Sequence, residues 1–227
     1  MTTLGIIGAG KAGMVLARLA AASGYRVLLA RSGDPAFIPL GAADREGGIT
    51  ATTVADAAER ADLVVLALPL SAHRTLPVSA LAGKTVVDAM NYWWETDGIR
   101  PDFADPRTSS SEIVQAFLPE SRVVKAFNHV GYHDLEDEPR PPGTPGRKAI
   151  AFAGDDAAAK VEVAQLIDDL GFDPVDAGPL AEGMRFEPNT ELFGADVTAT
   201  EVRAMLARFP TSARGQVVAR ARGRGVD

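Results

Sequence analysis

A glycine-rich turn close to the start of the chain has the residue types and spacing that bind a pyrophosphate. Gly8, Gly10 and Gly13 form the pattern G-x-G-x-x-G, directly after the apolar run Leu4–Ile7 and at the opening of a helical pattern. The first glycine permits a tight turn, the second lets the backbone approach a pyrophosphate, and the third lets helix and strand pack closely. Free N–H groups and the dipole at the start of a helix favour the anion. The motif therefore predicts a dinucleotide site, although glycine triplets also occur in turns that bind no ligand.

The residues after the second predicted strand indicate which dinucleotide binds. NAD-binding proteins usually place Asp or Glu about 20 residues after the glycines, where the carboxylate binds the ribose 2′-hydroxyl. Here the strand Arg26–Ala30 is followed by Arg31 and Ser32. An acidic residue would repel a 2′-phosphate, whereas a guanidinium and a hydroxyl can bind it. The sequence therefore favours NADP. In the alternative, Arg31 is a solvated surface residue and Asp34 binds the ribose.

Three further loops are expected to complete the cleft, because ligands of open α/β sheets bind at the carboxyl ends of the strands. These loops are Leu68–Ser71, Asn91–Trp94 and Asn128–Gly131. Their position favours contact with a ligand. In the alternative interpretation the polar residues only shape the loops, with the serine as a helix N-cap and the asparagines as turn residues.

Apolar runs alternate with amphipathic stretches over most of the chain. Short continuous apolar runs are typical of parallel strands buried on both faces, and the stretches between them have helical spacing. Ser109 and Glu112 form a capping box that opens one of these helices. The alternation predicts an α/β fold with a doubly wound, Rossmann-type parallel sheet. Strands are expected at 4–7, 26–30, 48–52, 62–68, 85–89, 123–127, 148–153 and 172–176. Helices are expected at 11–23, at 54–60, after residue 71, from the capping box to 118, and from a cap at 154–155 to 170.

Other segments have a different composition. Gly131–Arg147 contains four prolines and four acidic residues, which predicts a mobile loop without an element of its own. After Gly178 the pattern changes to helical cover at 192–193 and 202–209, and the arginine-rich end is expected to be a frayed terminus. We expect two parts: an NADP-binding domain over 1–180 and a small C-terminal cap over 181–227.

Composition excludes several classes of site. The chain has 227 residues, 46% of them hydrophobic, and no cysteine, so disulfides and thiolate-bound metals are excluded. The chain has only three histidines, His73, His129 and His133, and no metal site is predicted. A net charge of −7 argues against nucleic acid and anionic membranes as partners. Without a transmembrane-length apolar run or a signal-peptide pattern, the expected location is cytoplasmic.

Several segments resemble one known family. The chain is similar to the NADPH-dependent coenzyme F420 reductases and to the cytosolic NADPH domain of the six-transmembrane metalloreductases. The pair Gly-Asp-Asp and Asp-Ala-Gly-Pro-Leu, at 154–156 and 176–180, is the most specific part of the resemblance. The other matching segments are 8–13, 111–114 and 123–128.

The resemblance implies a dinucleotide-binding domain with a small C-terminal helical cap, a dimer, and hydride transfer between NADP and a deazaflavin. It implies that Ala9–Ala12 hold the pyrophosphate and that Leu68, Pro69 and His73 flank the adenosine. It also implies that the segment from Asn128 to Tyr132 lines the nicotinamide. Motif, loops and resemblance together predict cofactor binding by Gly8, Ala9, Gly10, Lys11, Ala12, Gly13, Arg31, Ser32, Leu68, Pro69, His73, Asn91, Asn128, His129 and Val130.

Three functions compete at this point. The first is an enzyme that moves hydride between NADP(H) and a planar acceptor such as coenzyme F420 or a flavin. The second, an imine or hydroxy-acid reductase, typically needs a further helical domain of about 100 residues and a general acid, for which the chain leaves too little room. The third is a non-catalytic NADP-binding sensor.

Direct hydride transfer between stacked rings requires orientation more than proton transfer, so no side chain is expected to be an indispensable acid or base. His129 and His133 are the rival candidates for that role. Trp93 and Trp94, the only tryptophans, follow the fifth predicted strand. We expect at least one of them to border the acceptor; in the alternative they anchor the loop or a dimer interface.

Overall fold

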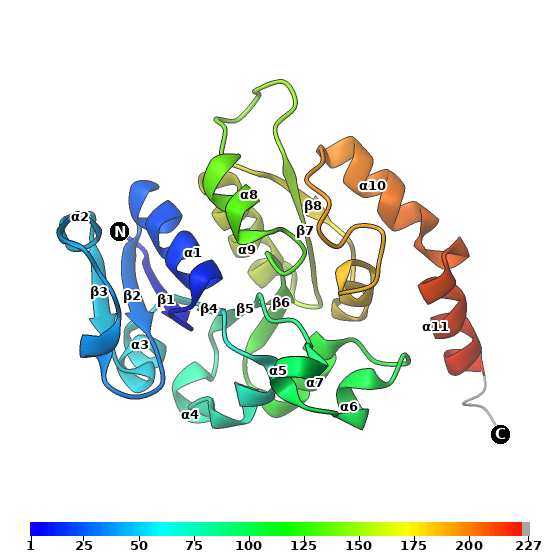
Figure 1. The fold of residues 1–227 in the computed structure, drawn as a ribbon, viewed down its shortest axis with the longest axis horizontal. Helices are drawn as coiled ribbons and strands as arrows, with labels where there is room; N and C mark the ends of the chain where they lie inside the picture. The colour runs from blue at the N-terminus through cyan, green and yellow to red at the C-terminus, as the bar shows by residue number, and fades with distance from the viewer. Residues whose placement is uncertain (224–227) are drawn as a thin grey trace.

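The computed structural model describes residues 1–223 and contains one eight-stranded sheet in the order β3-β2-β1-β4-β5-β6-β7-β8 (Figure 1). All neighbouring strands are parallel except β6 and β7. The doubly wound α/β prediction is confirmed. The strands are β1 Thr3–Ile7, β2 Arg26–Ala30, β3 Ile49–Thr52, β4 Leu63–Leu66, β5 Thr85–Asp88, β6 Arg122–Lys125, β7 Ala149–Gly154 and β8 Asp173–Asp176.

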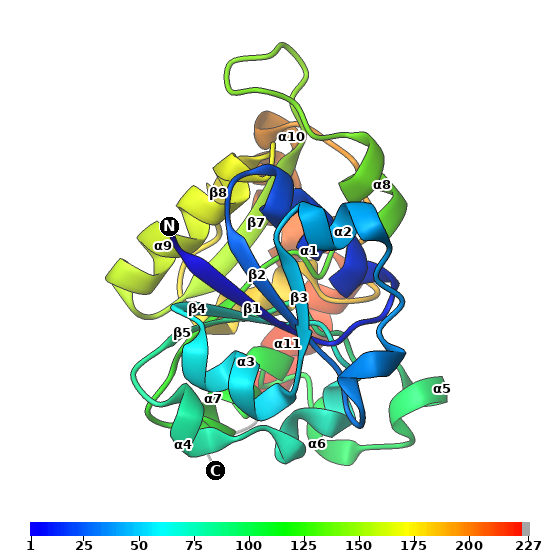
Figure 2. The same ribbon diagram turned by 90° about the vertical axis from the view of Figure 1, so that its left-hand side faces the viewer.

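Helices cover both faces of the sheet, as Figure 2 shows with α1 and α9 on one side and α3, α4 and α7 on the other. The strands alternate accordingly: Leu4 and Ile6 of β1 pack into the apolar cluster that contains α1 and α9, whereas Ile7 joins the opposite cluster. The helices are α1 Lys11–Ala22, η1 Pro35–Phe37, α2 Ala42–Glu46, α3 Val54–Arg60, η2 Leu70–Thr75, α4 Val78–Leu81, α5 Trp94–Asp97, α6 Pro101–Ala104, α7 Ser110–Phe117, α8 Tyr132–Asp137, α9 Ala157–Asp169, η3 Leu180–Phe186, α10 Ala199–Arg208, η4 Phe209–Thr211 and α11 Ala213–Gly223, where η marks a 3₁₀-helix.

A helical cover lies on the outer part of the sheet, beside β7 and β8 (Figure 1). Val202 and Leu206 of α10 pack with Ala151 of β7 and Val175 of β8 in one apolar cluster. Ile150, the neighbour of Ala151, faces the cluster that contains α9. This arrangement confirms the small C-terminal helical cap.

Capping residues set several helix boundaries. The predicted capping box at Ser109 and Glu112 is present, with the Glu112 carboxylate accepting a 2.6 Å hydrogen bond from the Ser109 N–H. The cap of α9 is Asp156, one residue beyond the predicted pair, because its carboxylate accepts the Ala159 N–H at 2.8 Å. After Ser71 the chain forms a 3₁₀ turn and a four-residue helix instead of one longer helix.

Four expectations are corrected by the structure. Strand β7 runs antiparallel to β6. The connection between them does not cross back to the amino ends of the parallel strands, so β7 starts from the carboxyl end of β6. Within the predicted loop 131–147, residues Tyr132–Asp137 form α8, where Leu135 is buried against the core. Leu192 is buried without being helical. The arginine-rich end forms α11 as far as Gly223, and the rest of that prediction lies outside the described residues.

Candidate functional site

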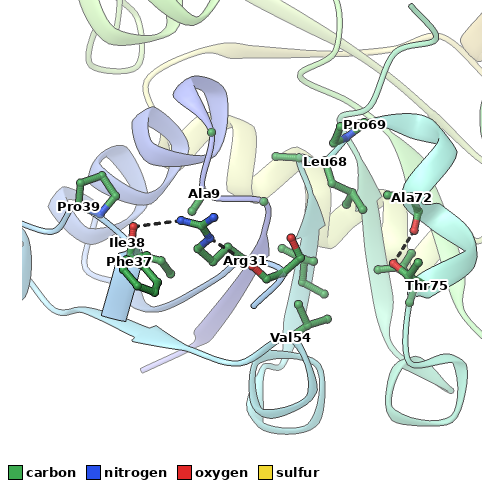
Figure 3. Close-up of a pocket in the computed structure, with 16 residues that line it drawn as sticks. Ala9, Arg31, Phe37, Ile38, Pro39, Val54, Leu68, Pro69, Ala72 and Thr75 are labelled. Atoms are coloured by element: carbon green, nitrogen blue, oxygen red, sulfur yellow. Dashed lines mark hydrogen bonds between the residues drawn. The ribbon is translucent and has the colours of Figure 1, made fainter. Parts of the chain in front are cut away.

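A cavity of about 600 Å³ opens at the carboxyl edge of β1, β2 and β4 (Figure 3). Seven of the predicted cofactor residues line it: Gly8, Ala9, Gly10, Arg31, Ser32, Leu68 and Pro69. The wall is completed by Ile7, Phe37, Ile38, Pro39, Val54, Ala67, Ala72, Thr75 and Leu76. The structure therefore brings together, in one cavity, three predicted segments that are far apart in the sequence: 8–10, 31–32 and 68–69.

The three glycines of the first turn differ in the space that surrounds them. Gly8 has a φ of +126°, and a Cβ there would lie 2.1 Å from the Ala67 carbonyl oxygen. A Cβ on Gly13 would lie 1.8 Å from the Gly8 carbonyl oxygen, so this position packs α1 against β1. Gly10 differs, because a Cβ there would have nothing within 4 Å. It is the N-cap of α1 and leaves the start of this twelve-residue helix open to an anion.

Arg31 lies along the cavity wall, between the glycine turn and η1 (Figure 3). Its Nε donates to the Ser32 carbonyl at 3.2 Å and its Nη1 to the Phe37 carbonyl at 3.2 Å. Two of the five guanidinium N–H donors are thus used, which leaves three for a phosphate. Asp34 caps η1, its carboxylate accepting the Ala36 N–H at 2.8 Å, and it does not line the cavity. This geometry disfavours the alternative in which Asp34 binds an unmodified ribose.

His73 does not have the place expected for it. Its side chain is buried at 2% exposure, its Nδ1 lies 2.8 Å from the Leu70 carbonyl, and its ring meets the edges of Phe103 and Phe117. The 3₁₀ geometry of η2 turns this residue into the core, while Ala72 and Thr75 line the cavity. His73 is therefore a packing residue, and the prediction that it flanks the adenosine is corrected.

The loops after β5 and β6 are hydrogen-bonded to each other through two asparagines. Asn91 Nδ2 donates to the Asn128 carbonyl at 2.7 Å, and Asn128 Nδ2 donates to Asn91 Oδ1 at 3.1 Å and to the Phe186 carbonyl at 2.9 Å. Asn128 is buried and follows Phe127, whose φ of +63° is rare for a side-chain-bearing residue. Neither asparagine lines the 600 Å³ cavity. Their contact with the nicotinamide, like that of the half-buried Val130, stays a prediction.

His129 is fully buried and has a structural role. Its Nε2 accepts the Ala151 N–H at 2.9 Å, and burial lowers its pKa from 6.5 to about 4. Its own carbonyl accepts the Gly194 N–H at 2.7 Å, which ties the β6 loop to the segment before α10. Its Nδ1 is buried and has no hydrogen-bond partner among residues 1–223. A neutral imidazole that is enclosed in this way, with Nε2 accepting a backbone bond, is poorly suited to proton transfer.

Lys11 and Ala12 lie at the start of α1, on the solvent side of the glycine turn. The Lys11 ammonium donates to the Tyr132 hydroxyl at 3.1 Å and lies 5.1 Å from the centre of that ring. Tyr132 stacks on His133, with ring centres 4.1 Å apart. Lys11 is thus an exposed cation next to the predicted pyrophosphate position.

A buried polar network beneath the asparagine loops was not found from the sequence. Lys125 has no exposed surface, and its Nζ donates to Asp88 at 3.2 Å, to the Met90 carbonyl at 2.6 Å and to Ser110 Oγ at 3.2 Å. Asp88 also accepts a 2.6 Å bond from Ser111 Oγ. The network fixes the ends of β5 and β6. A lysine within an otherwise apolar strand was the available signal, since a buried cation needs a partner.

The two tryptophans differ in their surroundings. Trp93 is 45% exposed and its ring packs edge-on against Phe193, with centres 5.7 Å apart. Trp94 is 63% exposed and opens α5. Trp93 therefore joins the β5 loop to the segment that also contacts His129.

Within residues 1–223 no group of three or more histidine, aspartate or glutamate side chains could hold a metal ion. Nor does any helix in that part of the chain have the length and apolarity to cross a membrane.

Comparison with known proteins supports the family resemblance seen in the sequence. Residues 3–92 match the family described as NADP oxidoreductase, coenzyme F420-dependent. The chain is 34% identical over 144 residues to the F420-dependent NADP reductase of Methanocaldococcus jannaschii, which covers 60% of this chain and 62% of that protein. It is 34% identical over 107 residues to the metalloreductase STEAP3 of Rattus norvegicus, which covers 47% of this chain and 20% of that protein. The chain thus spans less than two thirds of either relative.

A solved structure, the hypothetical protein SMa0349 from Sinorhizobium meliloti, is similar over nearly its whole length. It is 33% identical, with a TM-score of 0.75, over 87% of this chain and 96% of that one.

Proposed function

We propose that this chain, whose residues 3–92 match the family of coenzyme F420-dependent NADP oxidoreductases, transfers hydride between NADP(H) and a planar acceptor, coenzyme F420 or a flavin. The observation that carries the cofactor half is the 600 Å³ cavity, in which the glycine turn and Arg31 lie on a common wall. The acceptor half rests on the family match and on the exposed aromatic face of Trp93 at the same edge of the sheet.

The cofactor's expected placement follows from the cavity wall. The open start of α1 at Gly10 would hold the pyrophosphate, with the Lys11 ammonium as a nearby counter-charge. Arg31 and Ser32 would bind the 2′-phosphate, and the apolar side chains of Leu68 and Val54 would contact the adenine. The nicotinamide would then extend toward the loops after β4, β5 and β6. NADP(H) supplies or accepts the hydride when it is bound.

The polar residues at that end of the edge have partners already. Asn91 and Asn128 bind each other, His129 binds the backbone of β7, and Lys125 is enclosed by its three acceptors. Their role in this proposal is to hold the loops still, so that two rings meet face to face. Orientation of bound reactants alone contributes several kcal/mol to lowering a barrier, about 7–11 kcal/mol at best.

The remaining expectations belong to the same proposal. Residues 1–180 would form the NADP-binding domain and 181–227 the cap, in a cytoplasmic homodimer. Sedimentation of the purified protein tests the dimer independently of the chemistry.

The decisive experiment measures NADPH binding and NADPH oxidation separately. The purified protein is titrated with NADPH, then incubated with NADPH and, in parallel, coenzyme F420, FMN, riboflavin or a ferric chelate while NADPH absorbance is followed. We expect one NADPH per chain and turnover with a deazaflavin or flavin. Stoichiometric binding without turnover on any acceptor would instead make the chain an NADP-binding sensor, and no binding would refute the cofactor assignment.

A further inference from the structure

One buried carboxylate, that of Asp97, binds two loops at the carboxyl edge of the sheet: the segment beside the cofactor cavity and the loop that contains Trp93. Asp97 is 6% exposed. Its Oδ1 accepts the Ser71 N–H at 2.8 Å, and its Oδ2 accepts the Trp93 N–H at 2.9 Å. The two donors lie in different loops, the one after β4 and the one after β5. Asp97 closes the single turn α5, which Gly98 ends with a φ of +73°.

Ser71 belongs to the part of the chain that forms the cofactor cavity. It lies in η2, whose Ala72 and Thr75 line the cavity directly after Leu68 and Pro69. A ligand that packs against these residues restricts the backbone at Ser71. The N–H of Ser71 is therefore expected to respond to the occupant of the cavity.

Trp93 belongs to the loop after β5. Its ring packs on Phe193, and the adjacent Gly194 binds the His129 carbonyl. Its N–H donates to the Asp97 carboxylate, and its carbonyl accepts the Thr96 and Asp97 N–H groups at 2.9 and 2.7 Å. Of these bonds, the one to the Asp97 carboxylate links Trp93 to the loop after β4, because the same carboxylate binds Ser71. Bonds from an N–H to an ionised carboxylate are short and strong, so a single side chain is sufficient to relate the two loops.

We propose that Asp97 is a positioning residue that couples the two loops, so that NADP(H) in the cavity orders Trp93 for the acceptor. The inference rests on the proposed function, since it takes NADP(H) as the occupant of the cavity. Its consequence is ordered binding, with the planar acceptor held more tightly once the cofactor is in place. By linkage, the acceptor strengthens cofactor binding by the same factor.

The chain offers a matched control for this coupling. Asp102 lies on the same stretch and also reaches η2, through a 3.6 Å ion pair with Arg74. That pair is exposed on both sides and does not involve Trp93. Asp97→Asn keeps the shape of the side chain but replaces one acceptor oxygen with an NH₂ group that cannot accept an N–H. Asp102→Asn makes the same chemical change where no coupling is expected.

The experiment uses Trp94→Phe as background, so that Trp93 is the only tryptophan, and NADP⁺ as the probe. Amide hydrogen exchange resolved by NMR is measured at Ser71 and Trp93, together with Trp93 fluorescence, with and without NADP⁺. We expect NADP⁺ to slow exchange at both amides by about fivefold or more, in the usual range of coupling between sites. In Asp97→Asn the effect at Trp93 and the fluorescence response disappear while NADP⁺ still binds; in Asp102→Asn both persist.

Two results overturn the inference. One is protection of Ser71 by NADP⁺ with no change at Trp93 in the chain that retains Asp97, a measurement that needs no Asp97 variant to fold. The other is an unchanged Trp93 response in Asp97→Asn. Either result leaves the proposed function standing, whereas failure of NADP⁺ to bind refutes both and is seen directly in the titration.

Discussion

Replacing Arg31 with alanine tests the choice between NADP and NAD. Arg31 is exposed, uses two of its guanidinium donors on the carbonyls of Ser32 and Phe37, and retains three for the 2′-phosphate. A hydrogen bond to a charged group contributes about 1.5–3 kcal/mol, and solvent screening places an exposed contact at the lower end. Arg31→Ala is therefore expected to weaken NADPH binding about tenfold.

NADH lacks the 2′-phosphate, so its affinity should hardly change in Arg31→Ala. The assay is a fluorescence titration of both cofactors against the wild type, Arg31→Ala and Arg203→Ala, an exposed arginine on α10 that removes the same charge away from the cavity. The NADPH loss should shrink as ionic strength rises, because exposed charges are screened. Equal losses for NADPH and NADH, or an equal loss in Arg203→Ala, would refute the assignment of the 2′-phosphate to Arg31.

Three further predictions concern the scaffold of the site. Gly10→Ala should leave the unfolding free energy within about 0.5 kcal/mol, since its Cβ would have no protein atom within 4 Å. It should weaken NADPH binding about tenfold, because that Cβ would occupy the place proposed for the pyrophosphate. Gly13→Ala should lose about 3 kcal/mol in denaturant titration, since its Cβ would overlap the Gly8 carbonyl. Lys125→Met should cost about 3–5 kcal/mol by leaving the buried Asp88 carboxylate without its counter-charge, and a second change, Asp88→Asn, should recover part of that loss. His129 has a folded pKa of about 4 against 6.5 unfolded, so the unfolded chain binds more protons between these values and stability should fall as the pH drops through them. The loss should reach about 3 kcal/mol, and a His129→Gln variant with an equally steep pH dependence would contradict this.

The sequence predicted what depends on local pattern. All eight strands were expected within a few residues of their observed places, and for β1, β2, β4 and β5 the reason is that buried parallel strands are nearly continuous apolar runs. The capping box at Ser109 was also local, since cap and carboxylate are three residues apart. The wall of the cofactor cavity followed from the rule that ligands bind at the carboxyl ends of strands, which brings Gly8, Arg31 and Leu68 together.

What the sequence did not predict depends on contacts between distant residues. Asp97 binds Ser71, 26 residues away, and Lys125 binds Asp88, 37 residues away. No spacing rule connects such pairs before the sheet order is known. The role of His73 was implied by the family resemblance alone, and no local pattern in the sequence indicated that η2 would place this side chain in the core instead of in the cavity lining. The helix α8 was missed because the composition of its segment is dominated by prolines that follow it.

The arrangement of polar groups at the edge bears on the kind of catalysis that the fold supports. The buried polar side chains described there each bind a loop or strand: Asn128 binds Asn91, His129 binds β7, and Asp97 accepts two backbone N–H groups. Within residues 1–223, Asn128 Oδ1 and His129 Nδ1 are the atoms of these side chains that have no hydrogen-bond partner. Side chains held in this way stabilise a geometry, and the unpartnered His129 Nδ1 is buried outside the lining of the cavity. A reaction that required a general acid would therefore be expected to obtain it from solvent or substrate. Hydride transfer between two planar rings has no such requirement, and it is sensitive to small errors in orientation. A site whose polar residues hold loops, and whose exposed face at Trp93 is aromatic, matches that requirement.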